Sequence, residues 1–222
     1  MLQPATIQFL RGLKKNNTKE WFDANRKQYD AAKDDFAALV KTVIAAHAKS
    51  DETIASLQPK DCLFRINRDI RFSKDKSPYK TNFGAFINRG GKKSIYAGYY
   101  FHCEPGGGSF AGGGLWMPEP ENLAKVRQEI DYSFDEFKKI VTGKKFINIY
   151  GDLHKGDDVI LSREPKGYEK NNPAIEFIKL KSFIAMRPVT DEELTGKELV
   201  KTIAAAYSAL QPLVGFINRA LE

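Results

Sequence analysis

The stretch IYAGYYFHCEPGGGSFAGGGLW, residues 95–116, decides the fold class of this chain. Its first ten residues alternate between two sides, with Ile95, Ala97, Tyr99, Phe101 and Cys103 on one side and Tyr96, Gly98, Tyr100 and His102 on the other. Such a period of two is typical of a strand with one face on a core. A turn at residues 105–108 follows, and residues 109–116 have the pattern of a returning strand. The stretch therefore predicts an antiparallel hairpin.

Further strand patterns lie on both sides of this hairpin. Residues 83–88 run up to Arg89-Gly90-Gly91, residues 180–187 form another apolar segment, and residues 158–162 are the least marked. Residues 61–67 also alternate. Phe64 and Ile66 are expected on the apolar face of that segment, and Arg65 and Asn67 on its polar face.

Helical spacing is found towards both ends of the chain and between the strands. The expected helices cover residues 4–16, 17–49, 118–131 and 133–143, one turn from Asn172, and a last long helix from residue 190. Asn17 with Glu20, and Thr190 with Glu193, have the spacing of N-terminal caps. Pro212 is expected to end the last long helix. The predicted fold is α+β, a central antiparallel sheet with helices at both termini and a helical insertion, in a single domain of residues 1–222.

Composition limits the class of protein. With 222 residues, 42% of them hydrophobic and 28% charged, the chain has the composition of a soluble globular protein. Cys62 and Cys103 form no CxxC pair, so neither a disulfide framework nor a zinc site is expected, and a reducing cytoplasm is the expected location. Because we find no signal-peptide pattern and no apolar run near 18 residues, we expect no membrane partner.

The net charge of +7 is concentrated in one segment. Residues 65–93 contain nine lysines and arginines against Asp69 and Asp75, whereas acidic and basic residues cancel over the rest of the chain. The core of this segment is FRINRDIRFSKDKSPYKTNFG, residues 64–84. Its cations are interleaved with apolar anchors: Phe64, Ile66, Ile70, Phe72, Tyr79 and Phe83. A disordered basic tail lacks such anchors, so the pattern indicates a folded anion-binding surface.

The predicted anion site combines this segment with the polar face of the hairpin. Arginine offers a planar fork to phosphate or carboxylate, and lysine adds a point charge. The expected ligand-binding residues are Arg65, Arg68, Arg71, Lys74, Lys80, Tyr100 and His102. The alternative is structural, with several of these cations paired to Asp69, Asp75 and other carboxylates.

The sequence says less about catalysis, metals and cofactors. His102 is the candidate for acid–base chemistry, because its ordinary pKa lies near neutrality. Asp69 and Glu104 are further catalytic candidates as holders of a cation, but they lack metal-ligand spacing, so we predict no metal site and identify no cofactor. The runs Gly106–Gly108 and Gly112–Gly114 match no nucleotide-binding motif, which favours turns and close packing.

Several long motifs resemble one known family. They are residues 64–85, residues 97–120, PKGYE at 165–169, LKSF at 180–183, the N-terminal Trp21, Phe22 and Tyr29, and QPLVGFIN at 211–218. Together they resemble the DUF2461 family over nearly the whole chain. The resemblance implies a single soluble domain and carries over no catalytic residue, substrate or cofactor.

Three functions are therefore open. The first is recognition of an anionic ligand that contains phosphate, either a small molecule or nucleic acid. The second is a metal-dependent phosphoester hydrolase, in which Arg65 and Arg68 clamp the substrate while Asp69 and Glu104 hold the ion. The third is a partner-binding protein that docks an acidic surface. We favour the first because the charge is localised, and the sequence predicts no oligomeric state.

Overall fold

The computed structural model describes residues 1–71 and 74–222, so Phe72 of the predicted anchors lies outside the described residues. Within this described part the chain forms ten α-helices, one short 3-10 helix and four strands. The helices are α1 (Pro4–Lys15), α2 (Lys19–Ala24), α3 (Arg26–His47), η1 (Glu52–Ile54), α4 (Pro59–Cys62), α5 (Pro120–Tyr132), α6 (Phe134–Val141), α7 (Lys144–Tyr150), α8 (Ile175–Ile178), α9 (Asp191–Thr195) and α10 (Leu199–Leu221). The strands are β1 (Phe83–Asn88), β2 (Gly98–Cys103), β3 (Phe110–Leu115) and β4 (Phe183–Pro188).

The four strands form one antiparallel sheet in the order β1-β2-β3-β4. The predicted hairpin is β2 and β3, with Tyr100 opposite Gly112 and His102 opposite Phe110. Helices α5 to α8 lie between β3 and β4 in the chain, so the helical insertion is also present. The α+β prediction is confirmed.

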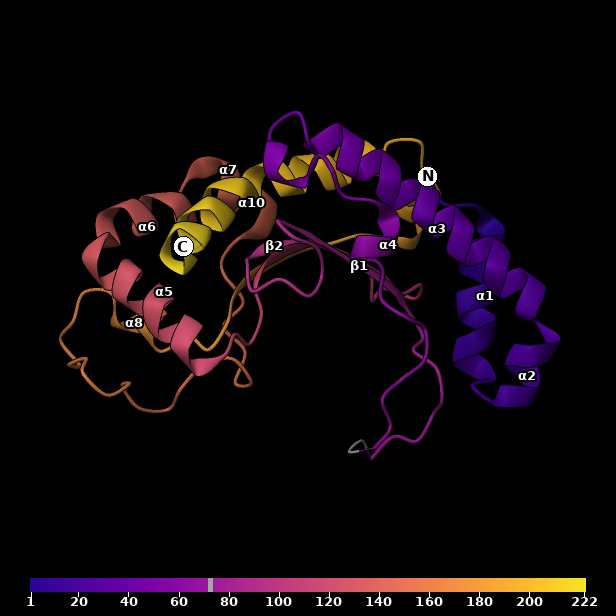
Figure 1. Cartoon of the computed structure of the whole chain (residues 1–222), viewed down its shortest axis with the longest axis horizontal. Helices are drawn as coiled ribbons and strands as arrows, with labels where there is room; N and C mark the ends of the chain where they lie inside the picture. Colours follow the sequence, from indigo (N-terminus) through magenta and orange to yellow (C-terminus); the bar gives the residue numbers. More distant parts are fainter. Residues whose placement is uncertain (72–73) are drawn as a thin grey trace.

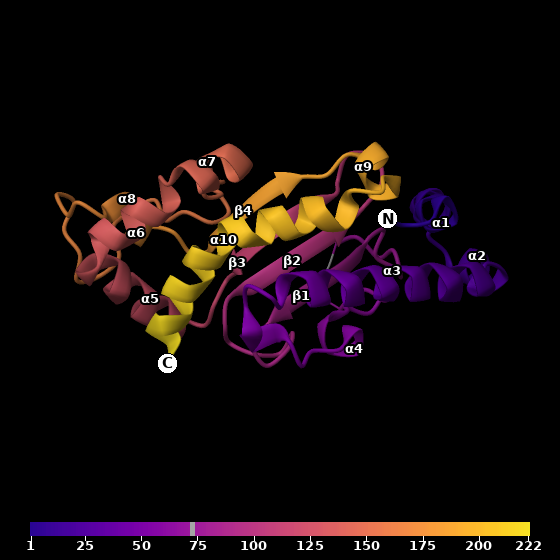
Figure 2. The same cartoon turned by 90° about the horizontal axis from the view of Figure 1, so that it is seen from above.

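One face of the sheet carries the core. Tyr99, Phe101 and Cys103 alternate along β2 and are almost fully buried. Figure 1 shows α3 and α10 on this side of the sheet, and Figure 2 shows the two helices lying side by side across it. The alternation thus predicted the buried side of the hairpin correctly from Ala97 to Cys103, whereas Ile95, expected on the same side, is 50% exposed.

Within residues 1–71 and 74–222, no helix lies across the opposite face of the sheet. In Figure 1 the described residues between α4 and β1 lie on one side of this open face, and helix α5 lies on the other. The residues that β2 directs away from the core, Tyr100 and His102, are therefore on the open face, and their cross-strand neighbours Gly112 and Phe110 share it.

The strand predicted at residues 61–67 was wrong. Gln58 and Asp61 form a capping box for the short helix α4, which begins at Pro59. After it, only isolated bridges join Leu63 to Ala85 and Asn67 to Tyr79. Phe64 and Ile66 consequently do not share a face, because Ile66 is buried while Phe64 is 41% exposed.

The helix boundaries also differ from the predictions. The long helix expected at residues 17–49 is divided at Asn25 into α2 and α3, and the cap of α2 is Thr18, whose side chain accepts a hydrogen bond from the Trp21 backbone N–H. Helix α7 is not among the helices expected from the sequence. The predicted box of Thr190 and Glu193 is present, but it caps the short α9.

Helix α10 continues through Pro212, which was expected to end it. A proline inside a helix removes one backbone hydrogen bond and bends the axis, and α10 changes direction along its length in Figure 2. By length and composition alone this helix is apolar enough to cross a membrane, with a mean hydropathy of 1.3 over a window that is 50% buried in the fold. Its apolar side packs on the sheet, which is a sufficient reason for that composition.

Candidate functional site

A cavity of about 740 Å³ opens on the uncovered face of the sheet. All four strands contribute to it, together with the segments before β1, before β2 and after β3. Six aromatic side chains line it: Phe64, Phe86, Tyr96, Tyr100, Phe110 and Trp116. Seven polar or charged side chains also line it: Lys80, Lys92, Ser94, His102, Glu119, Asn122 and His154. A concave, mainly apolar site of this volume with a few polar groups is typical of small-molecule binding.

Glycines of β3 form part of the cavity wall. A Cβ atom on Gly114 would lie 2.0 Å from the carbonyl oxygen of Phe183, and one on Gly112 would lie 2.0 Å from that of Ala185. Strands β3 and β4 therefore approach each other more closely than side chains would allow. As a result, β3 exposes bare backbone to the cavity at Gly113 and Gly114.

Exposed apolar side chains gather around the same cavity. Phe64, Ile95, Trp116 and Met117 are 41%, 50%, 56% and 41% exposed, and all four line it. Isolated surface hydrophobic residues need no explanation, but a group of them around one hollow is typical of a binding site.

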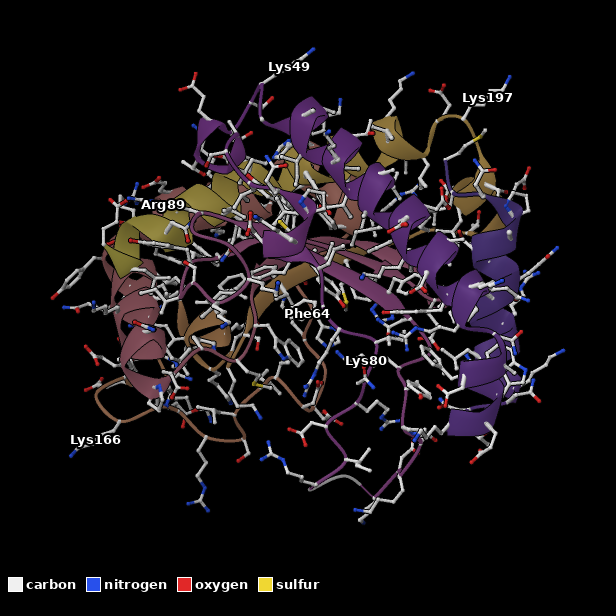
Figure 3. All side chains as sticks on the ribbon, turned by 45° about the vertical axis from the view of Figure 1, so that its right-hand side comes forward. Lys49, Phe64, Lys80, Arg89, Lys166 and Lys197 are labelled. Atoms are coloured by element: carbon white, nitrogen blue, oxygen red, sulfur yellow. The ribbon has the colours of Figure 1, made fainter. Side chains whose placement is uncertain are left out.

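Lys80 and Lys92 are cations of the basic segment that line this cavity, and Lys92 donates a hydrogen bond to the Lys60 carbonyl oxygen at 2.7 Å. Lys80 is partly buried, and its Nζ atom lies 5.4 Å from the centre of the Phe64 ring. Figure 3 shows the side chains of Lys80 and Phe64 close together beneath the sheet. Burial, and then the nearby Arg65 guanidinium, lower the pKa of Lys80. No carboxylate forms an ion pair with it in the described part of the chain. This ammonium group is partly desolvated beside a second cation.

A smaller hollow of about 390 Å³ adjoins Lys80. Its lining residues are Arg68, Asp69, Lys80, Thr81 and Asn82. Lys80 therefore lines both hollows, and two of the predicted ligand-binding cations meet in the smaller one.

The tip of the basic segment is internally paired. Arg68 forms an ion pair with Asp75, and Arg71 forms one with Asp69, with 2.6 Å between the Nη2 and Oδ2 atoms. The structural alternative weighed from the sequence thus describes these two arginines. Arg71 and Lys74 are exposed and line neither hollow, and Arg65 is exposed beside Lys80.

Tyr100 and His102 of β2, with Glu104 directly after the strand, form a hydrogen-bonded row on the open face of the sheet. The Tyr100 hydroxyl lies 3.1 Å from His102 Nδ1, and His102 Nε2 lies 3.3 Å from Glu104 Oε2. The other oxygen of Glu104 accepts hydrogen bonds from Lys14 and Thr81, each at 3.0 Å. The His102 ring also stacks on Phe110, with 4.9 Å between ring centres and an angle of 6° between the planes.

The surroundings of this row set its protonation. Burial lowers the pKa of His102, although Glu104 acts in the opposite direction. Burial also raises the pKa of Tyr100, to about 12. Burial also raises the pKa of Glu104. Hydrogen bonds from Lys14, His102 and Thr81 outweigh this effect, so the pKa of this carboxyl is below its ordinary value. At neutral pH the row therefore holds a phenol, a neutral imidazole and a carboxylate.

The predicted cation-holding carboxylates are occupied by other partners. Asp69 pairs with Arg71, and Glu104 pairs with Lys14. Among residues 1–71 and 74–222, no group of three or more histidine, cysteine, aspartate or glutamate side chains is arranged to hold a metal ion.

Of the predicted ligand-binding residues, the structure brings Lys80, Tyr100 and His102 together in the larger cavity. Sequence reasoning did not include Phe110, Asn122 and His154, which also line it. The hairpin register contained a signal for Phe110, because this residue lies opposite His102. No sequence signal links His154 or Asn122 to the open face.

Comparison with known proteins gives one result. A family model described as "Conserved hypothetical protein (DUF2461)" matches residues 5–216 of the 222-residue chain. Neither the curated proteins nor the solved structures give a match. The chain belongs to the DUF2461 family.

Proposed function

We propose that this DUF2461 protein binds a small ligand with a phosphate group and a ring-bearing, apolar body in the cavity on the open face of the sheet. The phosphate lies at Lys80, with Arg65 and Arg68 beside it. The body of the ligand packs against the aromatic wall that includes Phe110 and Trp116.

The position of Lys80 carries this proposal. An ammonium group that is partly desolvated beside Arg65, with no ion-paired carboxylate in the described residues, is stabilised when an anion arrives. Lys80 also lines both the large cavity and the smaller hollow with Arg68. An anion there gains a charge-assisted hydrogen bond in a site with reduced access to water.

A small ligand fits these features better than a nucleic acid strand. Non-specific binding of nucleic acid rests on many cations that follow the phosphate backbone. Here Arg68 and Arg71 are engaged by Asp75 and Asp69, and Lys80 at the cavity is accompanied by enclosing aromatic walls. The other two functions considered from the sequence, a metal-dependent phosphoester hydrolase and a protein that docks an acidic surface, stay predictions.

Calorimetric titration with phenyl phosphate tests the proposal, since this probe combines a ring with a phosphate group. We expect saturable binding by the wild-type chain and a dissociation constant roughly 10–100-fold larger for Lys80→Met, because a hydrogen bond to a charged group contributes about 1.5–3 kcal/mol. Lys93→Met is the matched control, since it removes an exposed cation of the same basic segment that does not line the cavity.

Two results would contradict the proposal. One is the absence of heat of binding at millimolar phenyl phosphate. The other is an equal loss of affinity in Lys80→Met and Lys93→Met, because equal losses would mean that general positive charge, and not the cavity, attracts the probe.

A further inference from the structure

The row of Tyr100, His102 and Glu104 is not used by the binding function proposed above. Tyr100 and His102 are alternate residues of β2, so they point to the same face of the sheet, and the contact with His102 places Glu104, the first residue after the strand, beside them. Tyr100 and His102 both line the large cavity. Glu104 is held from behind by Lys14 of helix α1 and by Thr81. A hydroxyl, an imidazole and a carboxylate therefore follow one another from the cavity towards the edge of the sheet.

The hydrogen-bond partners of His102 assign its proton. Glu104 is a carboxylate and can only accept, so Nε2 carries the hydrogen on that side. Nδ1 faces the Tyr100 hydroxyl at 3.1 Å and the side-chain nitrogen of Asn82 at 3.4 Å, and both of these groups can donate. Nδ1 is therefore the acceptor, and the phenol is the nearer of its two possible donors, which is the arrangement a general base needs.

Packing fixes the two reacting side chains. The His102 ring lies flat on Phe110. The Tyr100 hydroxyl lies over Gly84, where a Cβ atom would come within 2.6 Å of it. The absence of a side chain at Gly84 is thus what allows the phenol to reach His102.

We propose that Tyr100 is a nucleophile, activated by His102 and Glu104, that attacks the phosphorus of a phosphoester bound in the cavity. The substrate class rests on the proposed phosphate site at Lys80, whereas the activation of Tyr100 does not depend on it.

The proposed reaction transfers the phosphoryl group first to Tyr100 and then to water. The Tyr100 oxygen forms a bond to phosphorus as its proton moves to His102 Nδ1, and Glu104 stabilises the imidazolium ion that results. The bond from phosphorus to the leaving oxygen breaks, and His102 returns the proton to that oxygen. Water then attacks the phosphorus of the phosphotyrosine as one of its protons moves to His102 Nδ1. The bond from phosphorus to the Tyr100 oxygen breaks, phosphate is released, and His102 returns the proton to the phenolate. Lys80 offsets charge on the phosphoryl oxygens.

Benzenesulfonyl fluoride tests the activation without a known substrate, because it joins an aromatic ring to a tetrahedral electrophilic centre. Attack by a phenol oxygen forms an S–O bond and releases fluoride. Peptide mass spectrometry on the full chain compares labelling rates among its nine tyrosines. We expect Tyr100 to react faster than Tyr132, which is 77% exposed and serves as the internal control. His102→Gln should slow Tyr100 roughly 100-fold and leave Tyr132 unchanged.

A second measurement needs no variant. An unassisted phenol reacts about tenfold faster for each pH unit up to its pKa, which for Tyr100 is about 12. With neutral His102 as base, the labelling rate of Tyr100 should level off near neutral pH. The proposal is overturned if Tyr100 reacts more slowly than Tyr132, if His102→Gln leaves its rate unchanged, or if its rate keeps rising steeply above about pH 8.

Lys80→Met separates this inference from the binding function. Labelling of Tyr100 that persists in Lys80→Met supports the activation by His102, whatever that variant does to phenyl phosphate binding. If wild-type Tyr100 is labelled quickly but phenyl phosphate does not bind, the phosphate site is wrong and the activated tyrosine stands.

Discussion

Gly84 is the residue at which a single methyl group should disturb the Tyr100 site most directly. In Gly84→Ala the new Cβ would lie 2.6 Å from the Tyr100 hydroxyl, so the tyrosine ring must move. Because the contact is with the end of a side chain, we expect a cost of only about 1 kcal/mol in the free energy of unfolding. Labelling of Tyr100 by benzenesulfonyl fluoride should fall much more, since its hydroxyl leaves His102. Urea unfolding and peptide mass spectrometry give the two readouts.

The Tyr100→Phe background provides the control for this prediction. Without the hydroxyl, most of the clash at Gly84 disappears, so Gly84→Ala should cost less there than in the wild-type chain. An equal cost in both backgrounds would show that the methyl group meets something other than the Tyr100 hydroxyl.

His47 predicts how stability depends on pH. It is buried against Tyr99 and Tyr207, and burial lowers its pKa below the ordinary value of 6.5, although Asp51 opposes this effect. Below pH 6.5 the unfolded chain therefore binds a proton that the native chain resists, so the free energy of unfolding falls as the pH falls. Between about pH 7.5 and 5.5 this one group contributes a loss of at most about 1.4 kcal/mol.

Urea unfolding at the two pH values measures this loss. His102 should add to it in the same direction, since burial lowers its pKa too. His47→Gln should therefore reduce the pH dependence without abolishing it. A variant that keeps the full dependence would show that His47 is not the titrating group.

Individual site residues were predictable where a local pattern fixes their direction. The alternation in β2 is enough to place Tyr100 and His102 on one face and Cys103 in the core. The contact of Lys14 with Glu104 was not predictable, because 90 residues separate the two in the sequence and only the packing of α1 brings them together.

At the scale of the element, helix α10 offers a prediction on stability. Gly215 lies inside this helix, is exposed, and has no atom within 4 Å of the position that a Cβ would take. Gly215→Ala should therefore raise the free energy of unfolding by about 0.5–1 kcal/mol, because alanine loses less conformational freedom in a helix. Thermal or urea unfolding measures this gain, and a loss of stability would contradict the described environment of Gly215.

Strands and helices were predicted well where a pattern in the sequence continues over many residues. They were predicted poorly where a few residues favour different structures. Strands β1, β2 and β3 lie close to the predicted ranges, with glycine turns at residues 90–91 and 106–108 between them. The segment at residues 61–67 has the same alternation, but the cap at Gln58 and Asp61 starts α4 there instead. Pro212 was expected to end a helix, yet the packing of α10 on β3 keeps both halves helical.

At the scale of the whole molecule, the fold divides the basic segment into two parts. Its tip carries Arg68 and Arg71 in ion pairs with aspartates, whereas its end brings Lys80 under the sheet. The position of the excess charge was predictable from the sequence but this division was not, because which cation meets a carboxylate depends on the three-dimensional arrangement of residues 64–71 and 74–82. The aromatic cavity was also not predicted as such, since its walls come from all four strands, helix α5 and several connecting segments.

A crystal structure of the chain with phenyl phosphate tests the central claim most directly. We predict density for the phosphate within hydrogen-bonding distance of Lys80 Nζ, and density for the ring in the cavity beside Phe110 and Trp116. An empty cavity at a saturating concentration of the probe, or phosphate bound only at the exposed Lys74, would contradict the claim that the open face of the sheet is a ligand-binding site.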